Sequence, residues 1–345
     1  MPGISVPRRF AIFLTALLVL ILCGFAVLYF GYFLVSPAGT EKTEEIFVVK
    51  KGSGLRAIAA QLEERGLIKG NNLFMIWAYV RGGARDIKAG EYSLNQSMAP
   101  VKILHILTSG AVKTYSFTIP EGLSAEQIAD VLQRRNLVNK RDFIYLIHDK
   151  ALVASYHVEG ESLEGYLFPD TYVISRGIGA RDLIDLMVNR FWEVFNSLVE
   201  GRKLPMPVKD IVTMASIVEK ETGMAEERPI IASVFFNRLK KRMRLESDPT
   251  VIYGLKDFSG DLKRKDLRAP SPYNTYLHRG LPPGPIANPG MEALKAVINP
   301  LETDYLYFVS KNDGSHYFSS TLEEHNRAVY KYQKRRRRPA SGKNK

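Results

Sequence analysis

Hydrophobic residues form one uninterrupted run near the N-terminus and recur at helical spacing along most of the remaining chain. The run, residues 10–35 (FAIFLTALLVLILCGFAVLYFGYFLV), contains no charged residue. It exceeds the roughly 20 residues that cross a bilayer core and the roughly 7–15 residues of a signal-peptide apolar region. Because Ser36-Pro37-Ala38 offers only a weak cleavage site, the pattern predicts a retained transmembrane helix.

Charges on the two sides of this run predict its orientation. Arg8 and Arg9 precede it, whereas glutamates and a lysine follow within residues 41–45. The positive-inside rule then leaves residues 1–9 in the cytoplasm and everything after residue 36 outside. The only cysteine, Cys23, lies inside the run, so the exported part has neither a disulfide nor a thiol nucleophile.

A sequence repeat with a period of 70 residues follows a short polar tether. Residues 47–79 (FVVKKGSGLRAIAAQLEERGLIKGNNLFMIWAY) align with residues 117–149 (FTIPEGLSAEQIADVLQRRNLVNKRDFIYLIHD). Each copy begins as a strand, turns at a glycine and continues with apolar residues at helical spacing. With a further strand near residues 90–94, this strand–helix–helix pattern resembles the LysM carbohydrate-binding module. Two small α+β modules without a sugar site would show the same pattern.

From about residue 170 the pattern becomes mainly helical. Apolar spacing predicts helices over residues 180–200, 208–222 and 227–241. The proline-rich segment 269–290 (APSPYNTYLHRGLPPGPIANPG) is too long for a simple connection and is typical of a functional loop. Asn312-Asp313-Gly314 predicts a hairpin between residues 305–310 and 316–319. The predicted fold class is α+β, and two capping boxes, Ser124 with Gln127 and Thr321 with Glu324, mark helix starts.

Charge and composition narrow the chemistry. The formal net charge of +12 suggests an anionic partner, although five of the positive charges lie in residues 334–338 (KRRRR), a run typical of a solvated, disordered tail. There is no RNP-like strand and no zinc-finger spacing, so no nucleic-acid partner is expected. Without an H-E-x-x-H or G-x-S-x-G motif, the sequence predicts no metal and no cofactor. Acid–base chemistry by carboxyl groups remains, as in glycoside cleavage.

The stretch ASIVEKETG, residues 215–223, offers the clearest candidate for such a carboxyl group. Glu219 lies one turn after Ala215 and Ser216, whose small side chains would leave space above it. Glu221 points about 200° away at roughly 100° per residue, so the two cannot address one bond, and Glu221 could pair with a basic neighbour such as Arg228. Glu219 is the candidate for an acid with a raised pKa. An ordinary charged helix end is the alternative interpretation.

Six segments resemble one family closely, the endolytic murein transglycosylases of the YceG-like family. They are LEGYLFPDTY (163–172), ASIVEKETG (215–223), ASVFFNRL (232–239), SDPTVIYG (247–254), SPYNTY (271–276) and GLPPGPIANPG (280–290). The resemblance covers about residues 47–330 in order, and that family also carries an N-terminal membrane anchor. Lys220 follows Glu219, where soluble lytic transglycosylases usually have serine, and their Gly-Leu-Met-Gln motif is missing. A relationship to the soluble lytic transglycosylases is therefore implied only by the resemblance to the YceG-like family, and not by motifs of this sequence.

The resemblance implies a single-pass protein of the cell inner membrane whose exported domain is a lysozyme-like transglycosylase. Glu219 would be the catalytic acid, and the substrate would be peptidoglycan glycan strands as they leave peptidoglycan synthases. The implied substrate-binding residues are Ser216, Asp248, Tyr253, Asn274 and Tyr276. Asp248 could instead be a turn residue and Asn274 a loop cap, while Glu164 and Tyr172 could equally hold the domain boundary.

Two rival functions remain open at this point. A lysozyme-like hydrolase would use Asp248 or Glu246 to activate water, and a non-catalytic scaffold would bind glycan or synthases through the repeat. The predicted organisation is a cytoplasmic segment (1–9), a transmembrane helix (10–35), a tether (36–45), a LysM-like α+β module (46–112), a catalytic domain that contains the second repeat copy (113–332) and a basic disordered tail (333–345).

Overall fold

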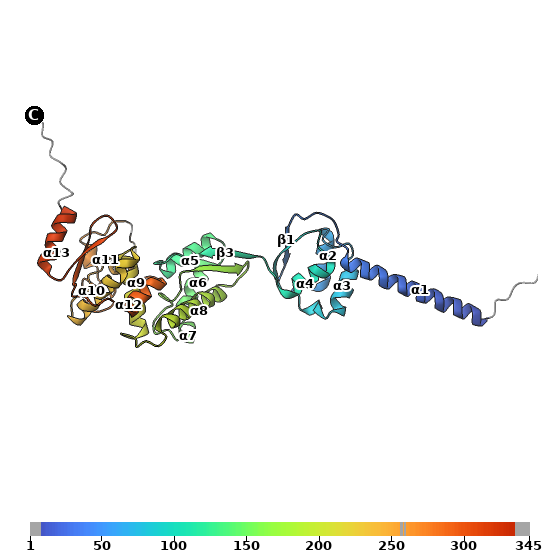
Figure 1. Ribbon diagram of the computed structural model, residues 1–345, viewed down its shortest axis with the longest axis horizontal. Helices are drawn as coiled ribbons and strands as arrows, with labels where there is room; N and C mark the ends of the chain where they lie inside the picture. Colours follow the sequence, from blue (N-terminus) through green and yellow to red (C-terminus); the bar gives the residue numbers. More distant parts are fainter. Residues whose placement is uncertain (1–7, 256–257, 259, 335–345) are drawn as a thin grey trace, which may run out of the picture. The chain divides into compact units, whose positions relative to one another are not determined.

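The computed structural model describes residues 8–255, 258 and 260–334, and side chains from residue 12 onward (Figure 1). These residues form two compact units. One consists of the chain up to Tyr115 together with Val173–Gly177, and the other consists of Ser116–Tyr172 and the chain from Ile178 onward. The strands β3 (Thr114–Thr118) and β4 (Thr171–Ser175), which pair in a two-stranded sheet, contain the boundaries between the units.

The first unit packs a two-stranded sheet and short helices around one apolar core. Its elements are α1 (Arg8–Val35), β1 (Glu45–Val49), α2 (Leu55–Glu64), α3 (Asn71–Val80), a 3₁₀ turn (Gly83–Arg85), β2 (Gly90–Leu94) and α4 (Pro100–Ser109). Strands β1 and β2 are antiparallel, with Glu45 opposite Leu94 and Val49 opposite Gly90. Alternate residues of both strands, among them Phe47 and Tyr92, are fully buried. The strand–helix–helix–strand order predicted for residues 47–94 is therefore present.

The chain between α1 and β1 is fixed to the first unit by backbone hydrogen bonds. The Gly39 N–H donates to the Gln96 carbonyl at 2.9 Å, and the Ser97 N–H donates to the Glu41 carbonyl at 3.1 Å. The residues predicted as a tether thus lie against the turn that follows β2.

The second unit is mainly helical and is arranged around α9. Its elements are α5 (Ala125–Arg134), α6 (Lys140–Ile147), α7 (Lys150–Ser155), α8 (Ala180–Val199), α9 (Val208–Glu221), α10 (Arg228–Lys240), α11 (Asp248–Gly254), α12 (Met291–Ile298), β5 (Tyr307–Ser310), β6 (His316–Ser319), α13 (Leu322–Val329) and a π-helical turn (Tyr330–Lys334). Helix α9 contacts α10, α11 and α12, and every residue from Ile211 to Val218 is buried. A helix buried on all sides occupies the core.

The coarse fold class is confirmed as mixed α+β, mostly helical, with small two-stranded sheets and an N-terminal apolar helix. Both predicted capping boxes are formed, and the hairpin pairs Tyr307 with Ser319 and Ser310 with His316. The helix predicted over residues 227–241 is present as α10, and a 3₁₀ turn (Ala225–Glu227) precedes it. The predicted basic tail lies outside the described residues beyond Lys334.

Candidate active site

Glu219 lies in the last turn of α9 with its side chain only 5% exposed. The Arg228 Nη2 donates to Glu219 Oε1 at 2.7 Å, and the Gly290 backbone N–H donates to Oε2 at 3.0 Å. Burial raises the pKa of Glu219, while the Gly290 N–H and the charge of Arg228 act in the opposite direction. Since burial is the largest of these effects, the carboxyl group is more easily protonated than an ordinary glutamate.

Two distant parts of the chain, residues 121–122 and Gly290, add to these surroundings. Gly290 is the N-cap of α12, so its free N–H and the helix dipole favour negative charge on Glu219. A Cβ on Gly290 would overlap the carboxylate of Glu121, whose Oε2 lies 3.4 Å from Arg228 Nη2. A Cβ on Gly122 would lie 3.4 Å from Glu219 Cγ. Backbone without side chains therefore approaches Glu219 closely.

Arg228 is a site residue that the sequence suggested as a partner of the wrong glutamate. It was a possible partner for Glu221, but it pairs with Glu219 and Glu121 and is itself 9% exposed. Its Nε is buried and has no hydrogen-bond partner within the described part of the chain. The helical wheel separated Glu219 from Glu221 correctly but gave no information on which face the start of α10 would cover.

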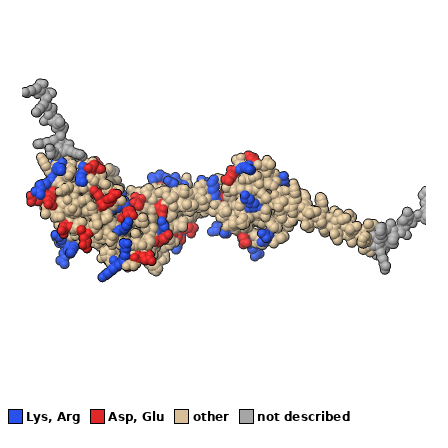
Figure 2. All heavy atoms as spheres, viewed as in Figure 1, with Lys and Arg blue, Asp and Glu red and all other residues tan. Residues whose placement is uncertain are grey.

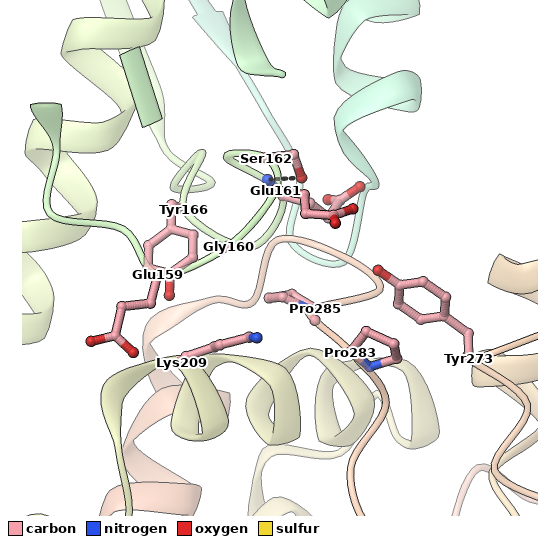
Figure 3. A pocket seen from close by; sticks show the side chains of 11 residues that line it. Glu159, Gly160, Glu161, Ser162, Tyr166, Lys209, Tyr273, Pro283 and Pro285 are labelled. Carbon is pink, nitrogen blue, oxygen red and sulfur yellow. Dashed lines mark hydrogen bonds between the residues drawn. The ribbon is translucent and has the colours of Figure 1, made fainter. Parts of the chain in front are cut away.

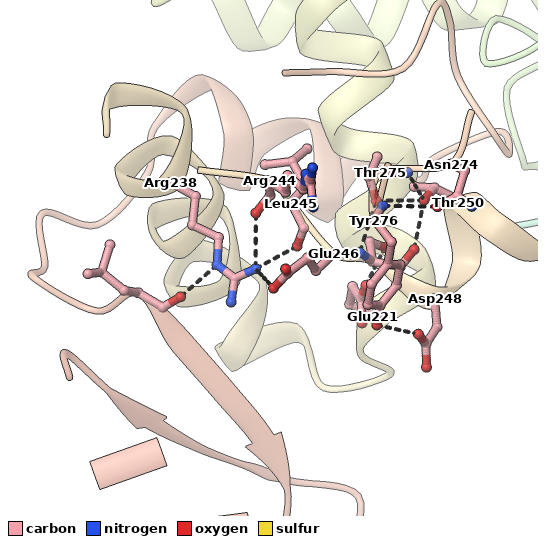
Figure 4. A network of polar contacts seen from close by, with 12 residues as sticks. Glu221, Arg238, Arg244, Leu245, Glu246, Asp248, Thr250, Asn274, Thr275 and Tyr276 are labelled. Carbon is pink, nitrogen blue, oxygen red and sulfur yellow. Dashed lines mark hydrogen bonds and ion pairs between the residues drawn. The ribbon is translucent and has the colours of Figure 1, made fainter. Parts of the chain in front are cut away.

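Glu221 points to a different polar network on the opposite face of α9 (Figure 4). It accepts a hydrogen bond from the Ser247 hydroxyl. Burial raises the pKa of Glu221 to about 7, the Ser247 hydrogen bond lowers it, and the nearby charge of Asp248 raises it further. Asp248 in turn accepts a hydrogen bond from the Tyr276 hydroxyl at 2.6 Å. The two glutamates of ASIVEKETG thus have separate partners, as their spacing predicted.

Two of the predicted substrate-binding residues lie inside the protein. Ser216 is fully buried, donates to the Thr213 carbonyl at 2.7 Å and accepts from the Ile286 N–H at 3.0 Å. It therefore connects α9 to the loop before α12. Asn274 is also fully buried; its side chain donates to the carbonyls of Leu267 and Ala269. The loop-cap interpretation of Asn274 fits these contacts.

The other predicted binding residues are nearer the surface. Asp248 is exposed and Tyr276 is half-buried. Tyr253 is half-buried, donates to Glu164 Oε2 at 3.2 Å and has its ring 4.8 Å from that of Tyr273. The structure thus pairs Asp248 with Tyr276 and Tyr253 with Tyr273, and it shows neither pair bonded to Glu219.

Glu164 is a second buried carboxyl group and connects several elements. It accepts hydrogen bonds from the Ala125 N–H at 3.0 Å and the Asn288 side-chain amide at 2.9 Å. Burial raises the pKa of Glu164 to about 7, although the hydrogen bonds, first that of Ala125, lower it. Its partners belong to the start of α5, the loop before α12 and, through Tyr253, α11. All of these partners lie within the second unit, so Glu164 holds elements of that unit together and not, as the alternative had it, the boundary between the units.

Glu164 also contributes to the wall of a cavity of about 170 Å³ (Figure 3). Glu159, Tyr166, Lys209 and Tyr273 are among the other residues that line it. Glu219 is not part of this lining, so the cavity and the Glu219 carboxyl group are distinct features of the second unit. Among the described residues, no group of three or more histidine, cysteine, aspartate or glutamate side chains is arranged to hold a metal ion.

Comparisons with known proteins define the class to which this fold and site belong. The model of the family described as YceG-like matches residues 47–331. An "Endolytic murein transglycosylase" of Bacillus subtilis (strain 168) is 37% identical over 332 residues, which cover 90% of this chain and 91% of that protein. A protein of the same name from Streptococcus pneumoniae (strain ATCC BAA-255 / R6) is 31% identical over 341 residues, 87% of this chain and 61% of its own.

A solved structure agrees with these sequence matches. The crystal structure of a YceG-like protein from Listeria monocytogenes is 34% identical, with a TM-score of 0.56, and the match covers 84% of this chain and all of that one. The chain belongs to the YceG-like family.

Proposed function

We propose that the protein is a membrane-anchored lytic transglycosylase that cleaves peptidoglycan strands internally between N-acetylmuramic acid and N-acetylglucosamine. The observation that carries the proposal is Glu219, a buried carboxyl group with a raised pKa beside a backbone N–H and an arginine. The names of the relatives from B. subtilis and S. pneumoniae support the reaction class.

In the proposed reaction, Glu219 acts first as an acid and then as a base. Its proton passes to the glycosidic oxygen as the bond from that oxygen to C1 of the muramic acid breaks. The resulting carboxylate accepts the proton of the muramyl 6-hydroxyl, whose oxygen forms a new bond to C1. The products are a 1,6-anhydro end and a free 4-hydroxyl, and Glu219 regains its proton. Arg228 and the Gly290 N–H stabilise the intermediate carboxylate.

Membrane attachment is a further part of the proposal. The apolar helix over Ile12–Val35 is 24 residues long, and Figure 2 shows no charged side chain along its described part. With Arg8 and Arg9 before it, the N-terminus would face the cytoplasm, and the rest of the first unit and the whole second unit would lie outside the inner membrane. There the enzyme would meet strands that leave a synthase, so that cleavage ends their elongation.

The hydrolase alternative now depends on a different residue. Asp248 bonds to Tyr276 and Glu246 pairs with Arg238 at 3.4 Å, whereas Glu121 is the second carboxylate beside Arg228. Glu121 is 46% exposed, so it could activate a water molecule. A hydrolase would leave a reducing sugar end in place of the 1,6-anhydro end.

Mass spectrometry of fragments released from purified glycan strands decides between the two reactions. We expect anhydro-ended fragments from the wild-type protein and from Glu121→Gln, and no fragments from Glu219→Gln. Reducing ends that disappear in Glu121→Gln would instead establish the hydrolase. A non-catalytic scaffold would release no fragments at all, and its Glu219→Gln variant would retain cellular function.

A further inference from the structure

The first unit presents an unusual apolar stripe on α3. Leu73, Ile76, Trp77 and Val80 follow one another at the i, i+3, i+4, i+7 spacing of a single helix face. Leu73 and Trp77 are partly buried against the core, but Ile76 is 51% and Val80 is 70% exposed. Burying rather than exposing such side chains is favourable by roughly 25 cal/mol per Å² of apolar surface. Covering the exposed part of the stripe with another apolar surface would therefore be favourable.

The contacts between α1 and α3 show what lies beside this stripe. The rings of Phe30 and Trp77 are 6.4 Å apart in an edge-on arrangement, and Phe33 is 7% exposed within the core of the first unit. A Cβ on Gly70, at the start of α3, would lie 3.5 Å from the Phe33 ring. The apolar helix and the stripe are thus continuous within one compact unit.

The length of the apolar helix then sets the depth of Trp77 in a membrane. Its 24 residues span about 36 Å at 1.5 Å per residue, compared with a hydrocarbon core of about 30 Å. Phe30 lies five residues before the end of α1 at Val35, roughly 7 Å along the axis. Trp77, in contact with Phe30, would therefore lie near the boundary between acyl chains and headgroups, where tryptophan is enriched.

The polar neighbour of the stripe fits the same location. The Arg81 guanidinium lies over the Trp77 ring at 5.3 Å and its side chain is exposed. An arginine next to an interfacial tryptophan can bind lipid phosphate groups while the apolar residues enter the acyl region. We propose that α3 is a second, interfacial membrane contact, with Ile76, Trp77 and Val80 in the outer leaflet of the membrane that α1 spans. This inference rests on the membrane span proposed above.

The two tryptophans of the chain allow a direct test in the full-length protein. Trp192→Phe leaves Trp77 as the only tryptophan, and Trp77→Phe leaves Trp192, whose Nε1 donates to the Tyr156 carbonyl in the second unit. Both variants are reconstituted in vesicles of phosphatidylethanolamine and phosphatidylglycerol that carry bromine near the carbonyl end of the acyl chains. We expect the emission of Trp77 to be strongly quenched, as for a side chain at the boundary between acyl chains and headgroups, and that of Trp192 to be unchanged.

Surface substitutions test the stripe itself. Adding Ile76→Asp and Val80→Asp to the Trp192→Phe variant should abolish the quenching of Trp77, because two charges oppose entry into the acyl region. The matched control is Tyr145→Asp, which replaces a side chain that is 71% exposed in the second unit and should leave the quenching unchanged. Unquenched Trp77 in the starting variant would overturn the proposal, as expected if the stripe instead binds a protein partner.

Labelling of Cys23 shows whether a negative result concerns the interfacial contact alone or the proposed membrane span as well. It is the only cysteine of the chain and lies near the middle of the apolar helix. If α1 spans the bilayer, a water-soluble maleimide should label Cys23 in detergent but not in vesicles. Protected Cys23 with unquenched Trp77 would overturn only the interfacial contact, whereas labelled Cys23 in vesicles would overturn both.

Discussion

In the proposed reaction Glu219 has to satisfy two opposing requirements, since an acid–base residue must hold a proton and then release it. Burial of the carboxyl group favours the protonated form, and the Arg228 guanidinium at 2.7 Å favours the anion. The raised pKa indicates that burial prevails in the free protein. When the glycosidic oxygen takes the proton, the arginine and the Gly290 N–H are already positioned to stabilise the carboxylate.

Substituting each glutamate of α9 separately tests the assignment of the catalytic residue. Glu219→Gln keeps the size of the side chain but removes the proton, so we expect glycan cleavage to fall by at least roughly 10²–10⁴-fold. Glu221→Gln should retain most activity, because Glu221 bonds to Ser247 and not to Arg228. Release of anhydro-ended fragments measures both, with circular dichroism as the folding control. An active Glu219→Gln and an inactive Glu221→Gln would reverse the assignment.

Replacing Arg228 should change the pH dependence of cleavage. The positive charge of Arg228 lowers the pKa of Glu219, so Arg228→Gln raises that pKa further. Since the reaction needs the protonated acid at its start, the alkaline limb of the pH–rate profile should move to higher pH. The maximal rate should fall as well, because the carboxylate loses its partner.

Arg190→Gln provides the matched control for the Arg228 variant. It removes an arginine whose ion pairs with Asp170 and Glu193 are more exposed. This variant should leave the pH profile in place. An unchanged alkaline limb in Arg228→Gln would show that Arg228 does not act on Glu219.

At the scale of elements, α9 carries two buried glutamates on two faces, and both raised pKa values make stability depend on pH. The pKa of Glu221 is raised from 4.5 to about 7, so the folded state binds this proton more tightly than the unfolded state. Its contribution to the free energy of unfolding is complete below about pH 4.5 and is lost as the pH rises through about 7. The order of magnitude is about 3 kcal/mol, at about 1.4 kcal/mol per pKa unit.

Glu221→Gln should remove the Glu221 part of this dependence, since glutamine does not titrate. We expect the second unit of the wild type to lose stability between about pH 4.5 and 7, and the variant to lose less by about 3 kcal/mol. Urea unfolding followed by Trp192 fluorescence, in a Trp77→Phe background, reports on the second unit alone. Equal slopes for the two proteins would mean that Glu221 does not keep its proton in the folded state.

Local signals predicted many elements, and contacts distant in sequence explain what was missed. The capping boxes, the hairpin and the two faces of α9 depend on residues that are close together in the sequence, so local patterns predicted them. Local patterns could not predict all partners of Glu219, because Gly290 is 71 residues away in the sequence. Ser216 was expected to line a cleft, but the loop before α12 covers it through the Ile286 N–H. A helical wheel gives the direction of a side chain and not the segment that lies there.

At the scale of the whole molecule, the segment between α1, the proposed membrane span, and β1 is held more firmly than its length suggests. A free segment over residues 36–45 would reach at most roughly 35 Å. In the structure, however, Gly39 and Glu41 are bonded to the turn after β2, and Phe33 is buried in the first unit. The last turns of α1 therefore dock directly on the rest of that unit, so packing as well as linker length would set its distance from the proposed membrane.

This packing predicts that a flexible linker alone will not free the enzyme from the membrane surface. A Gly/Ser insertion of about 20 residues after Pro37, with a mean reach of roughly 25 Å, should loop out while Phe33 stays buried. Only the insertion combined with Phe33→Ala, which costs roughly 3–5 kcal/mol of packing, should let cleavage reach older glycan far from the bilayer. The measurement is the strand-length distribution in cells, with the same linker appended to the C-terminus as control. A shift caused by the insertion alone would show that α1 is not docked on the first unit in the membrane.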